Sequence, residues 1–321
     1  MRAITVSEHG GPEVLHYGEA PDPAPGPGQV LVRTSAIGVN FIDTYFREGM
    51  YPTALPYIPG SEGSGTVVAV GEGVVDRAVG DVVAWSDAPG SYAELVTVAA
   101  ERTVVVPDGV APEVAASVLL QGMTAHYLTH DSYPVQAGDT VLVHAGAGGT
   151  GLLVTQFAAA RGARVITTVS TDEKERLSRD AGAWQVLRYD EDIAARAREL
   201  TGGEGVAAVY DGVGKDTFEA SLAAVRRRGI VVLFGAASGP VPPFDLQRLN
   251  PLGSLYVQRP SLGAYVATPE EFARRSLDVL DGLHDGSLRF RVGATYPLAE
   301  ASRAHIDLQA RRTTGSVALL P

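Results

Sequence analysis

The pattern of apolar and polar positions divides the chain into two parts. In the first part, short alternating or β-branched runs are separated by Gly and Pro, as at residues 30–33, 65–70 and 81–85. This pattern is typical of strands and turns. The proline-rich residues 21–28 can join neither a helix nor a central strand, so they indicate a surface crossing.

From about Gly122, strand patterns alternate with helical patterns. The helical patterns cover residues 151–161, 172–180, 192–200 and 216–227, and the strand patterns cover residues 164–169, 186–187, 206–210 and 230–234. This alternation predicts a doubly wound parallel sheet. A strand pattern at 254–258 and helices after Thr268 and Leu298 indicate that the chain then returns to its first domain. We therefore expect an α/β protein with a mainly-β domain at 1–121, completed by 262–321, and a cofactor domain at 122–261.

A glycine-rich turn follows the apolar run at residues 141–145 and opens a helical pattern. Its sequence is Gly146-Ala147-Gly148-Gly149-Thr150-Gly151. In a dinucleotide-binding fingerprint the first glycine makes the tight turn, the second lets backbone approach a pyrophosphate, and the third allows close helix–strand packing. The helix N-terminus then receives the negative charge. The position between a strand and a helix, with a second strand pattern following, favours nucleotide binding over a structural turn.

The end of the second strand of this unit indicates which nucleotide binds. NAD enzymes usually place Asp or Glu there to accept hydrogen bonds from the ribose 2′-hydroxyl. Here the strand ends in Thr167-Thr168-Val169-Ser170, and Lys174 follows within the next turn. A strand tip without a carboxylate, followed by a lysine, favours the 2′-phosphate of NADPH. Alternatively, Ser170 or Thr171 simply caps the helix, with Ser170 and Glu173 spaced as a capping box.

Composition and charge fit an ordinary enzyme. The chain has 321 residues, 45% of them hydrophobic, which suffices for two domains with separate cores. A formal net charge of -11 disfavours non-specific binding to nucleic acid or anionic lipid. The chain has no cysteine, which excludes disulfides and thiolate-bound zinc. The first residues lack an apolar signal core and no apolar run approaches a membrane span, so we expect a cytoplasmic protein without a membrane partner.

Several short segments resemble the bacterial NADPH:quinone oxidoreductases of the zeta-crystallin type, and the resemblance extends over essentially the whole chain. These segments are AIGVNFIDTY (36–45), GSEG (60–63), AGAGGTG (145–151), GAWQ (182–185), YD (210–211) and RPSL (259–262). The family forms the zinc-free branch of the medium-chain dehydrogenase/reductase superfamily. The resemblance implies a GroES-like catalytic domain, a Rossmann domain, a homodimer, and NADPH-dependent reduction of a quinone in the cleft between the domains.

The chain departs from the zinc alcohol dehydrogenases of that superfamily at two ligand positions. Asn40 stands where those enzymes have a cysteine, and Ser61 stands where they have a histidine. A catalytic zinc needs three protein ligands, so we expect no metal. His126 and His130 share a helix face but lack the intervening Glu and the further ligand of a metal motif. Without a Lewis acid the substrate must accept hydride readily, as quinones and activated enones do.

The resemblance also implies the site residues. It places Asn40, Asp43, Tyr45 and Tyr51 near the nicotinamide and substrate, where a protonated tyrosine can donate to an oxyanion. For the tyrosines the alternative is packing, and for Asp43 it is the fixing of a turn. Gln121 lies where some relatives carry lysine. Besides the glycine-rich turn, the residues implied to contact the cofactor are Phe41, Tyr127, Ser170, Lys174, Tyr189, Phe234, Gly235 and Arg311.

Two other functions stay open at this point. An NADPH-dependent reductase of α,β-unsaturated carbonyls would use the same cofactor site. A non-enzymatic protein that binds NADPH or RNA is the alternative of a different class, although the negative net charge and the lack of a basic aromatic run argue against RNA. For the homodimer, residues 229–234 and 254–258 are apolar strands near the sheet edge where two sheets could join.

Overall fold

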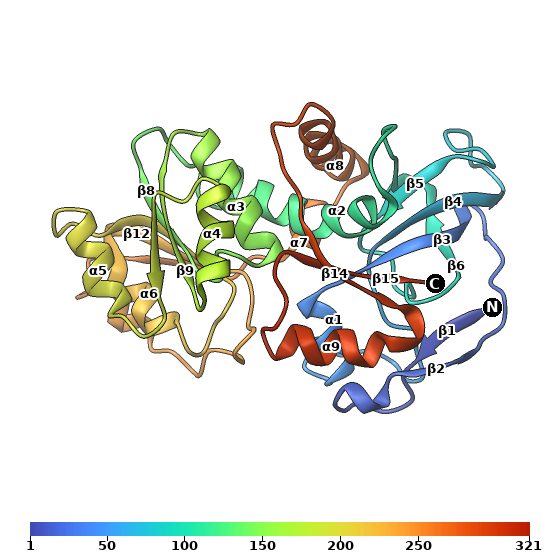
Figure 1. Cartoon of the computed structure of the whole chain (residues 1–321), viewed down its shortest axis with the longest axis horizontal. Helices are drawn as coiled ribbons and strands as arrows, with labels where there is room; N and C mark the ends of the chain where they lie inside the picture. The colour runs from blue at the N-terminus through green and yellow to red at the C-terminus, as the bar shows by residue number, and fades with distance from the viewer. The chain divides into compact units, whose positions relative to one another are not determined.

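The computed structural model describes all residues, 1–321, and the chain divides into two compact units. Unit 1 comprises residues 1–123 and 266–321, and unit 2 comprises residues 124–265. Figure 1 shows both chain ends in unit 1, because that unit is built from the first and last parts of the sequence. Helix α2 (Pro112–Tyr127) crosses the first division.

Unit 1 is built on a mainly antiparallel sheet of order β14-β15-β3-β4-β5-β7, with β6 also paired to β3. Strands β14 and β15 come from the end of the chain. They join the sheet where β15 pairs with β3, so this sheet needs both parts of the sequence. The strands of the unit are β1 (Arg2–Thr5), β2 (His16–Glu19), β3 (Gln29–Val39), β4 (Gly63–Val70), β5 (Val82–Trp85), β6 (Leu95–Ala99), β7 (Thr103–Val105), β14 (Val292–Pro297) and β15 (Ser316–Leu320).

The long strand β3 shows how the sequence pattern forms the core of unit 1. Its alternating residues Val30, Val32 and Ala36 are fully buried, as expected when successive side chains point to opposite faces. Trp85 of β5 is also fully buried and packs in the same cluster as Val30 and Val32. Helices α1 (Phe41–Arg47), α8 (Pro269–His284) and α9 (Ala301–Gln309) complete the unit, together with the short 3-10 helices η1 (Pro12–Val14), η2 (Ala100–Arg102) and η5 (Leu298–Glu300).

Unit 2 is a parallel six-stranded sheet of order β10-β9-β8-β11-β12-β13, so the predicted doubly wound sheet is confirmed. The right-handed crossover rule places α3 and α4 on one face and α5 and α6 on the other, and the helices within each pair contact each other (Figure 1). The strands are β8 (Thr140–Val143), β9 (Arg164–Val169), β10 (Gln185–Arg188), β11 (Val206–Asp211), β12 (Val225–Leu233) and β13 (Tyr256–Gln258). The helices are α3 (Gly149–Ala160), α4 (Asp172–Asp180), α5 (Ile193–Leu200), α6 (Phe218–Ala224), α7 (Leu262–Tyr265), the π-helix η3 (Leu128–Ser132) and the 3-10 helix η4 (Leu246–Leu249).

One predicted helix ends earlier than expected. The helical pattern at 216–227 predicted a single helix, but α6 stops at Ala224 and Val225 begins β12 by pairing with Val206. Arg228 then takes a left-handed backbone with φ 58°, and the strand resumes when Ile230 pairs with Ala208. Three arginines in a row are compatible with a helix, so the prediction was wrong because sheet pairing overrides local propensity here.

None of the helices is both long and apolar enough to cross a membrane.

Candidate active site

The glycine-rich loop leaves the carboxyl end of β8, and crowding explains its composition. A Cβ on Gly146 would lie 2.5 Å from Cβ of Thr167 on β9, and a Cβ on Gly151 would collide with the carbonyl oxygen of Ala145. Ala145 itself has a left-handed backbone with φ 53°. The tight turn and the close approach of helix and strand therefore have the geometry that the fingerprint requires.

Helix α3 begins inside this loop and presents backbone donors. Its N-cap is Gly148, which has no side chain to satisfy the first N–H groups. These groups, from Gly149, Thr150 and Gly151, have no acceptor within the helix. Together with the positive end of the helix dipole they suit a phosphate. The neighbouring Ala145 N–H donates to the Tyr189 hydroxyl at 2.9 Å, so Tyr189 lies beside this loop.

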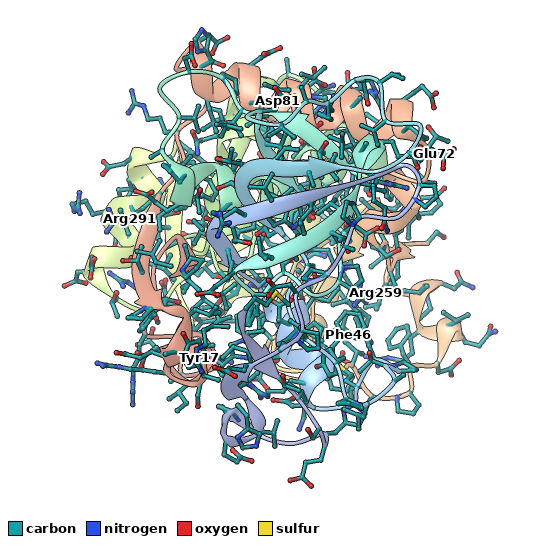
Figure 2. The ribbon with its side chains drawn as sticks, turned by 90° about the vertical axis from the view of Figure 1, so that its right-hand side faces the viewer. Tyr17, Phe46, Glu72, Asp81, Arg259 and Arg291 are labelled. Atoms are coloured by element: carbon teal, nitrogen blue, oxygen red, sulfur yellow. The ribbon has the colours of Figure 1, made fainter.

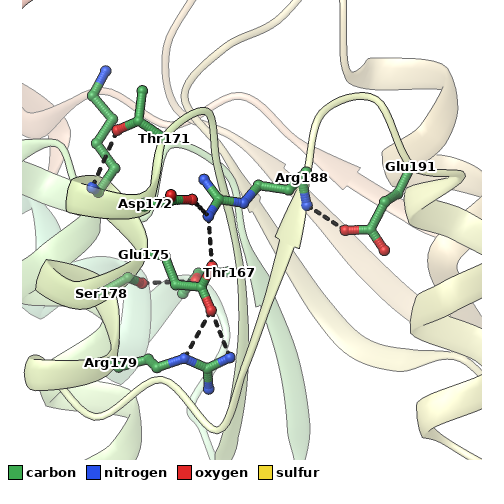
Figure 3. A network of polar contacts seen from close by, with 9 residues as sticks. Thr167, Thr171, Asp172, Glu175, Ser178, Arg179, Arg188 and Glu191 are labelled. Atoms are coloured by element: carbon green, nitrogen blue, oxygen red, sulfur yellow. Dashed lines mark hydrogen bonds and ion pairs between the residues drawn. The ribbon is translucent and has the colours of Figure 1, made fainter.

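The end of β9 carries no carboxylate, and Lys174 lies in the first turn of the helix that follows. Thr171 caps α4, because its Oγ1 accepts the Lys174 N–H at 3.3 Å (Figure 3). Of the two predicted caps, Thr171 is therefore confirmed, and the capping box of Ser170 and Glu173 is wrong. The backbone of Thr171 is still extended, with φ -143° and ψ 162°, so the helix starts one residue later than that box requires.

Behind the loop, a buried polar network joins three strand ends to α6. Ser221 donates to Oδ2 of Asp211 at 2.7 Å, and its oxygen lies 3.1 Å from Nε2 of His144. The other ring nitrogen, Nδ1, lies 3.0 Å from Oγ1 of Thr168. Burial lowers the pKa of His144, so the ring is neutral and connects Thr168 to Ser221 by hydrogen bonds. Sequence reasoning gave Ser221 no role, because its partners lie on strands that are distant in the sequence.

The remaining predicted cofactor residues of unit 2 have distinct surroundings. Phe234 and Gly235 follow the carboxyl end of β12, where a Cβ on Gly235 would lie 2.5 Å from the Gly212 carbonyl oxygen. Tyr127 is buried and stacks on Tyr265, with ring centroids 4.1 Å apart and planes within 6°. Sequence reasoning missed Tyr265, because nothing local links it to a residue on another helix.

In unit 1, Asp43 organises the start of α1. Its Oδ2 accepts the backbone N–H of Asn40 at 2.8 Å and the Tyr92 hydroxyl at 3.1 Å, while Oδ1 accepts the Ser61 hydroxyl at 3.3 Å. Burial raises the pKa of Asp43 to about 6, although these hydrogen bonds act in the opposite direction. Asp43 is 1% exposed, and its contacts favour the structural alternative over direct contact with a substrate.

A directional chain of hydrogen bonds connects Asp43 to the end of the protein. Arg47 can only donate, so its Nη1 donates to Nδ1 of His305 at 2.9 Å. The His305 proton is then on Nε2, which donates to the Tyr92 oxygen at 3.0 Å, and Tyr92 donates to Asp43. Burial and the neighbouring Arg47 lower the pKa of His305 to about 3, which keeps the ring neutral. All four side chains are buried, so α9 and α1 are fixed to each other.

The Asn40 side chain is held by two further buried residues. Its Nδ2 donates to Oε1 of Glu62 at 2.6 Å, and its Oδ1 accepts from Nε2 of Gln121 at 3.1 Å. Gln121 also donates to the Ser316 hydroxyl at 3.0 Å, while Oε2 of Glu62 accepts the Leu120 N–H at 2.9 Å. Burial raises the pKa of Glu62 to about 8, so this carboxyl group is largely protonated at neutral pH. Glu62 and Gln121 thus set the orientation of the Asn40 amide.

The aromatic residues of α1 and the turn after it form one cluster. The ring of Tyr51 packs edge to face against both Tyr45 and Phe46, each at a centroid distance of 5.5 Å (Figure 2 labels Phe46). Phe41 lies 6.5 Å from Tyr45 between ring centroids. Tyr45 is 7% exposed, whereas Tyr51 is half-buried. Their rings therefore pack in the cluster while their hydroxyl groups can still form hydrogen bonds. The structure thus brings together Asn40, Phe41, Asp43, Tyr45 and Tyr51 around α1.

Arg311 and the pair of His126 and His130 are the other residues that the sequence singled out. Arg311 follows α9 in a left-handed turn with φ 58°, and its N–H donates to the Leu308 carbonyl, as at a helix end. His126 and His130 stack at a centroid distance of 4.0 Å against Phe157. The structure contains no group of three or more His, Cys, Asp or Glu side chains that could hold a metal ion.

Two protein families match separate parts of this chain. The alcohol dehydrogenase GroES-like domain family matches residues 26–108, and the zinc-binding dehydrogenase family matches residues 149–281. The chain is 48% identical over 323 residues to quinone oxidoreductase of Pseudomonas aeruginosa, covering 100% of this chain and 99% of that protein. It is 40% identical over 330 residues to 2-haloacrylate reductase of a Burkholderia species, with 100% and 99% coverage. A mycobacterial protein solved in complex with NADPH has a TM-score of 0.98 and 57% identity over 100% of both chains.

These likenesses extend over the full chain, and they agree with the GroES-like and Rossmann architecture that the sequence predicted. The zinc-binding description belongs to the matched family, and this chain has no cysteine that could supply a thiolate ligand. The chain belongs to the quinone oxidoreductase family, on the zinc-free branch of the medium-chain dehydrogenase/reductase superfamily.

Proposed function

We propose that this protein reduces quinones with NADPH and without a metal ion. The observation that carries the proposal is the candidate dinucleotide site of unit 2. There the closely packed glycines of the loop occur together with Lys174 and with a helix N-terminus that no side chain caps. Full-length similarity to a quinone oxidoreductase and to an NADPH-bound structure supports the choice of acceptor and cofactor.

The residues present fit NADPH. The N–H groups at the start of α3 suit the pyrophosphate, since no side chain caps them. Ser170, Lys174 and Tyr189 would surround the 2′-phosphate, and Phe234 and Gly235 would approach the nicotinamide from the end of β12. When bound, NADPH supplies the reducing equivalents, which is chemistry that the cofactor carries and the protein does not.

The residues around α1 would bind and orient the acceptor. Reduction of a quinone leaves charge on a delocalised oxygen, which ordinary hydrogen-bond donors can stabilise. Tyr45 and Tyr51 would supply hydroxyl donors, and Asn40 would present an amide whose orientation Glu62 and Gln121 fix. Asp43 would act through Asn40 by holding the start of α1 in place.

A second candidate is the reduction of α,β-unsaturated carbonyls. The full-length similarity to 2-haloacrylate reductase supports it, because the same cofactor residues would serve both reactions. The higher identity to a quinone oxidoreductase favours quinones.

The test is NADPH oxidation by chelator-treated protein with a panel of quinones and enones, and with NADH in parallel. We expect turnover of quinones with a strong preference for NADPH. Turnover of enones alone would transfer the proposal to alkene reduction. NADPH binding without turnover of any acceptor would contradict an enzymatic role and favour a binding protein.

We also propose that the protein works in the cytoplasm as a homodimer. Strand β13 supports the dimer, because it pairs with β12 on one side only and Tyr256 is 63% exposed. Strand β12 lies one strand inside the sheet, so of the two predicted joining segments only 254–258 reaches the edge. We propose the cytoplasmic location because the proposed reaction requires a supply of NADPH.

A further inference from the structure

The first turn of α4 is acidic, which is unexpected beside a proposed phosphate site. Asp172, Glu173 and Glu175 surround Lys174 in the sequence, so three carboxylates accompany one ammonium group. A phosphate monoester carries about 1.5 to 2 negative charges near neutral pH. Unless these carboxylates are neutralised, they would repel the 2′-phosphate that Lys174 is proposed to attract.

Arg188 neutralises two of them. It is the last residue of β10, and Figure 3 shows its side chain reaching from the strand to α4. Its Nη2 lies 2.7 Å from Oδ1 of Asp172 and 2.6 Å from Oε2 of Glu175, and the other oxygen of Glu175 accepts from Arg179. The pKa of Glu175 is lowered by Arg179 and Arg188, so the carboxylate is ionised and needs its partners.

Arg188 is also fixed in place. Its backbone N–H donates to Oε1 of Glu191 at 2.6 Å, and its side chain is only 25% exposed. Tyr189, which contacts the glycine-rich loop, is the next residue. A single guanidinium thus bridges α4 and the strand end at the position where the 2′-phosphate would bind.

We propose that Arg188 is a specificity-determining positioning residue that gives this protein its preference for NADPH over NADH. It acts through Asp172 and Glu175, by neutralising these carboxylates and holding them away from the 2′-phosphate. The inference rests on the proposed function, because it assumes that Lys174 and Tyr189 border the phosphate.

The experiment compares dissociation constants for NADPH and NADH, measured by nucleotide fluorescence in the absence of any acceptor. Arg188→Gln should raise the NADPH constant about fivefold, the size of effect expected for partly exposed charges, and change the NADH constant less than twofold. The difference should shrink at high salt because these charges are screened. Arg176→Gln is the matched control, since it removes the same charge from α4 but breaks only a pair with Asp180 at 3.2 Å.

The decisive variant combines Arg188→Gln with Asp172→Asn and Glu175→Gln. Removing the freed carboxylates should restore the NADPH constant to within about twofold of the original. A triple variant that stays weak for NADPH would show direct contact between Arg188 and the phosphate, which overturns the inference. An equal loss for both dinucleotides, or the same loss in Arg176→Gln, would also overturn it. Wild-type protein that binds neither dinucleotide would remove the proposed function itself, whereas an unchanged preference in Arg188→Gln would remove only this inference.

Discussion

At the scale of single residues, the site depends on buried polar groups whose partners lie far away in the sequence. Asp43 and His305 are connected through Tyr92, and Asn40 is held by Glu62 and Gln121. The sequence identified Asn40 and Asp43 through their family resemblance and identified Lys174 by its position after a strand. It gave no role to Glu62 or His305, because only the folded chain brings their partners within hydrogen-bond distance.

The buried Glu62 makes stability dependent on pH. Its pKa is raised by burial from 4.5 to about 8 in the folded protein, so the folded state holds a proton that the unfolded state has released. The contribution of Glu62 to stability is therefore largest at low pH and falls as the pH rises through this window. Asp43 contributes in the same direction only up to its pKa of about 6. Between about pH 6 and pH 8, the contribution of Glu62 to the free energy of unfolding should fall by roughly 1 kcal/mol per pH unit. His305 opposes this change, because the folded state keeps its ring neutral while the unfolded state protonates it as the pH falls.

The variant Glu62→Gln tests this prediction, because the amide cannot titrate. In urea denaturation between pH 6 and pH 8, we expect the pH slope of the variant to be more positive than the wild-type slope by roughly 1 kcal/mol per pH unit, whatever the absolute stability of the variant. Glu72→Gln, which changes an exposed glutamate, should keep the wild-type slope (Figure 2 labels Glu72). Equal slopes for Glu62→Gln and wild type would mean that Glu62 is already ionised in the folded protein near neutral pH.

At the scale of elements, the pattern of the sequence predicted the strands and helices of unit 2 well. Strand β9 and helix α4 have the predicted bounds, since each is a run of uniform character between turn signals. The end of α6 and the start of β12 differ from the predicted bounds, because pairing between Val225 and Val206, and not local propensity, determines where the helix ends and the strand begins. The positions of β14 and β15 beside β3 also depend on contacts between distant segments.

The contact between the glycine-rich loop and β9 yields a prediction at this scale. In Gly146→Ala, the new methyl group would lie 2.5 Å from Cβ of Thr167, so the loop must move away from the strand. We expect NADPH to bind at least about tenfold more weakly, because the N–H donors of α3 would shift with the loop. Fluorescence titration measures the change, and circular dichroism checks that the fold is retained.

Gly263→Ala serves as the control for this substitution. Gly263 lies in α7, and a Cβ there would meet nothing within 4 Å. It should bind NADPH as the wild type does. If Gly146→Ala also binds NADPH normally while remaining folded, the loop does not hold the dinucleotide in the proposed manner.

At the scale of the whole molecule, the division into two units explains which parts of the fold can be predicted from local sequence patterns. Unit 2 is one uninterrupted segment, so its alternating pattern can be followed along the chain. Unit 1 needs both ends of the chain, and the buried pair of Arg47 and His305 bridges 258 positions. The net charge of -11 also belongs to this scale, because it is a property of the summed surface and argues against RNA as a partner.

The free edge of the parallel sheet yields the last prediction, which concerns assembly. Strand β13 exposes unpaired backbone groups on one side, and such an edge is a template for pairing with a second copy of the chain. In Tyr256→Lys, two copies that meet edge to edge would bring like charges together, so the proposed dimer should dissociate at micromolar concentration in sedimentation velocity. Tyr17→Lys changes an exposed tyrosine of β2 in unit 1 and should leave the dimer intact (Figure 2). A Tyr256→Lys protein that sediments like the wild-type dimer would place the interface elsewhere, and a monomeric wild type would show that this edge stays unpaired in solution.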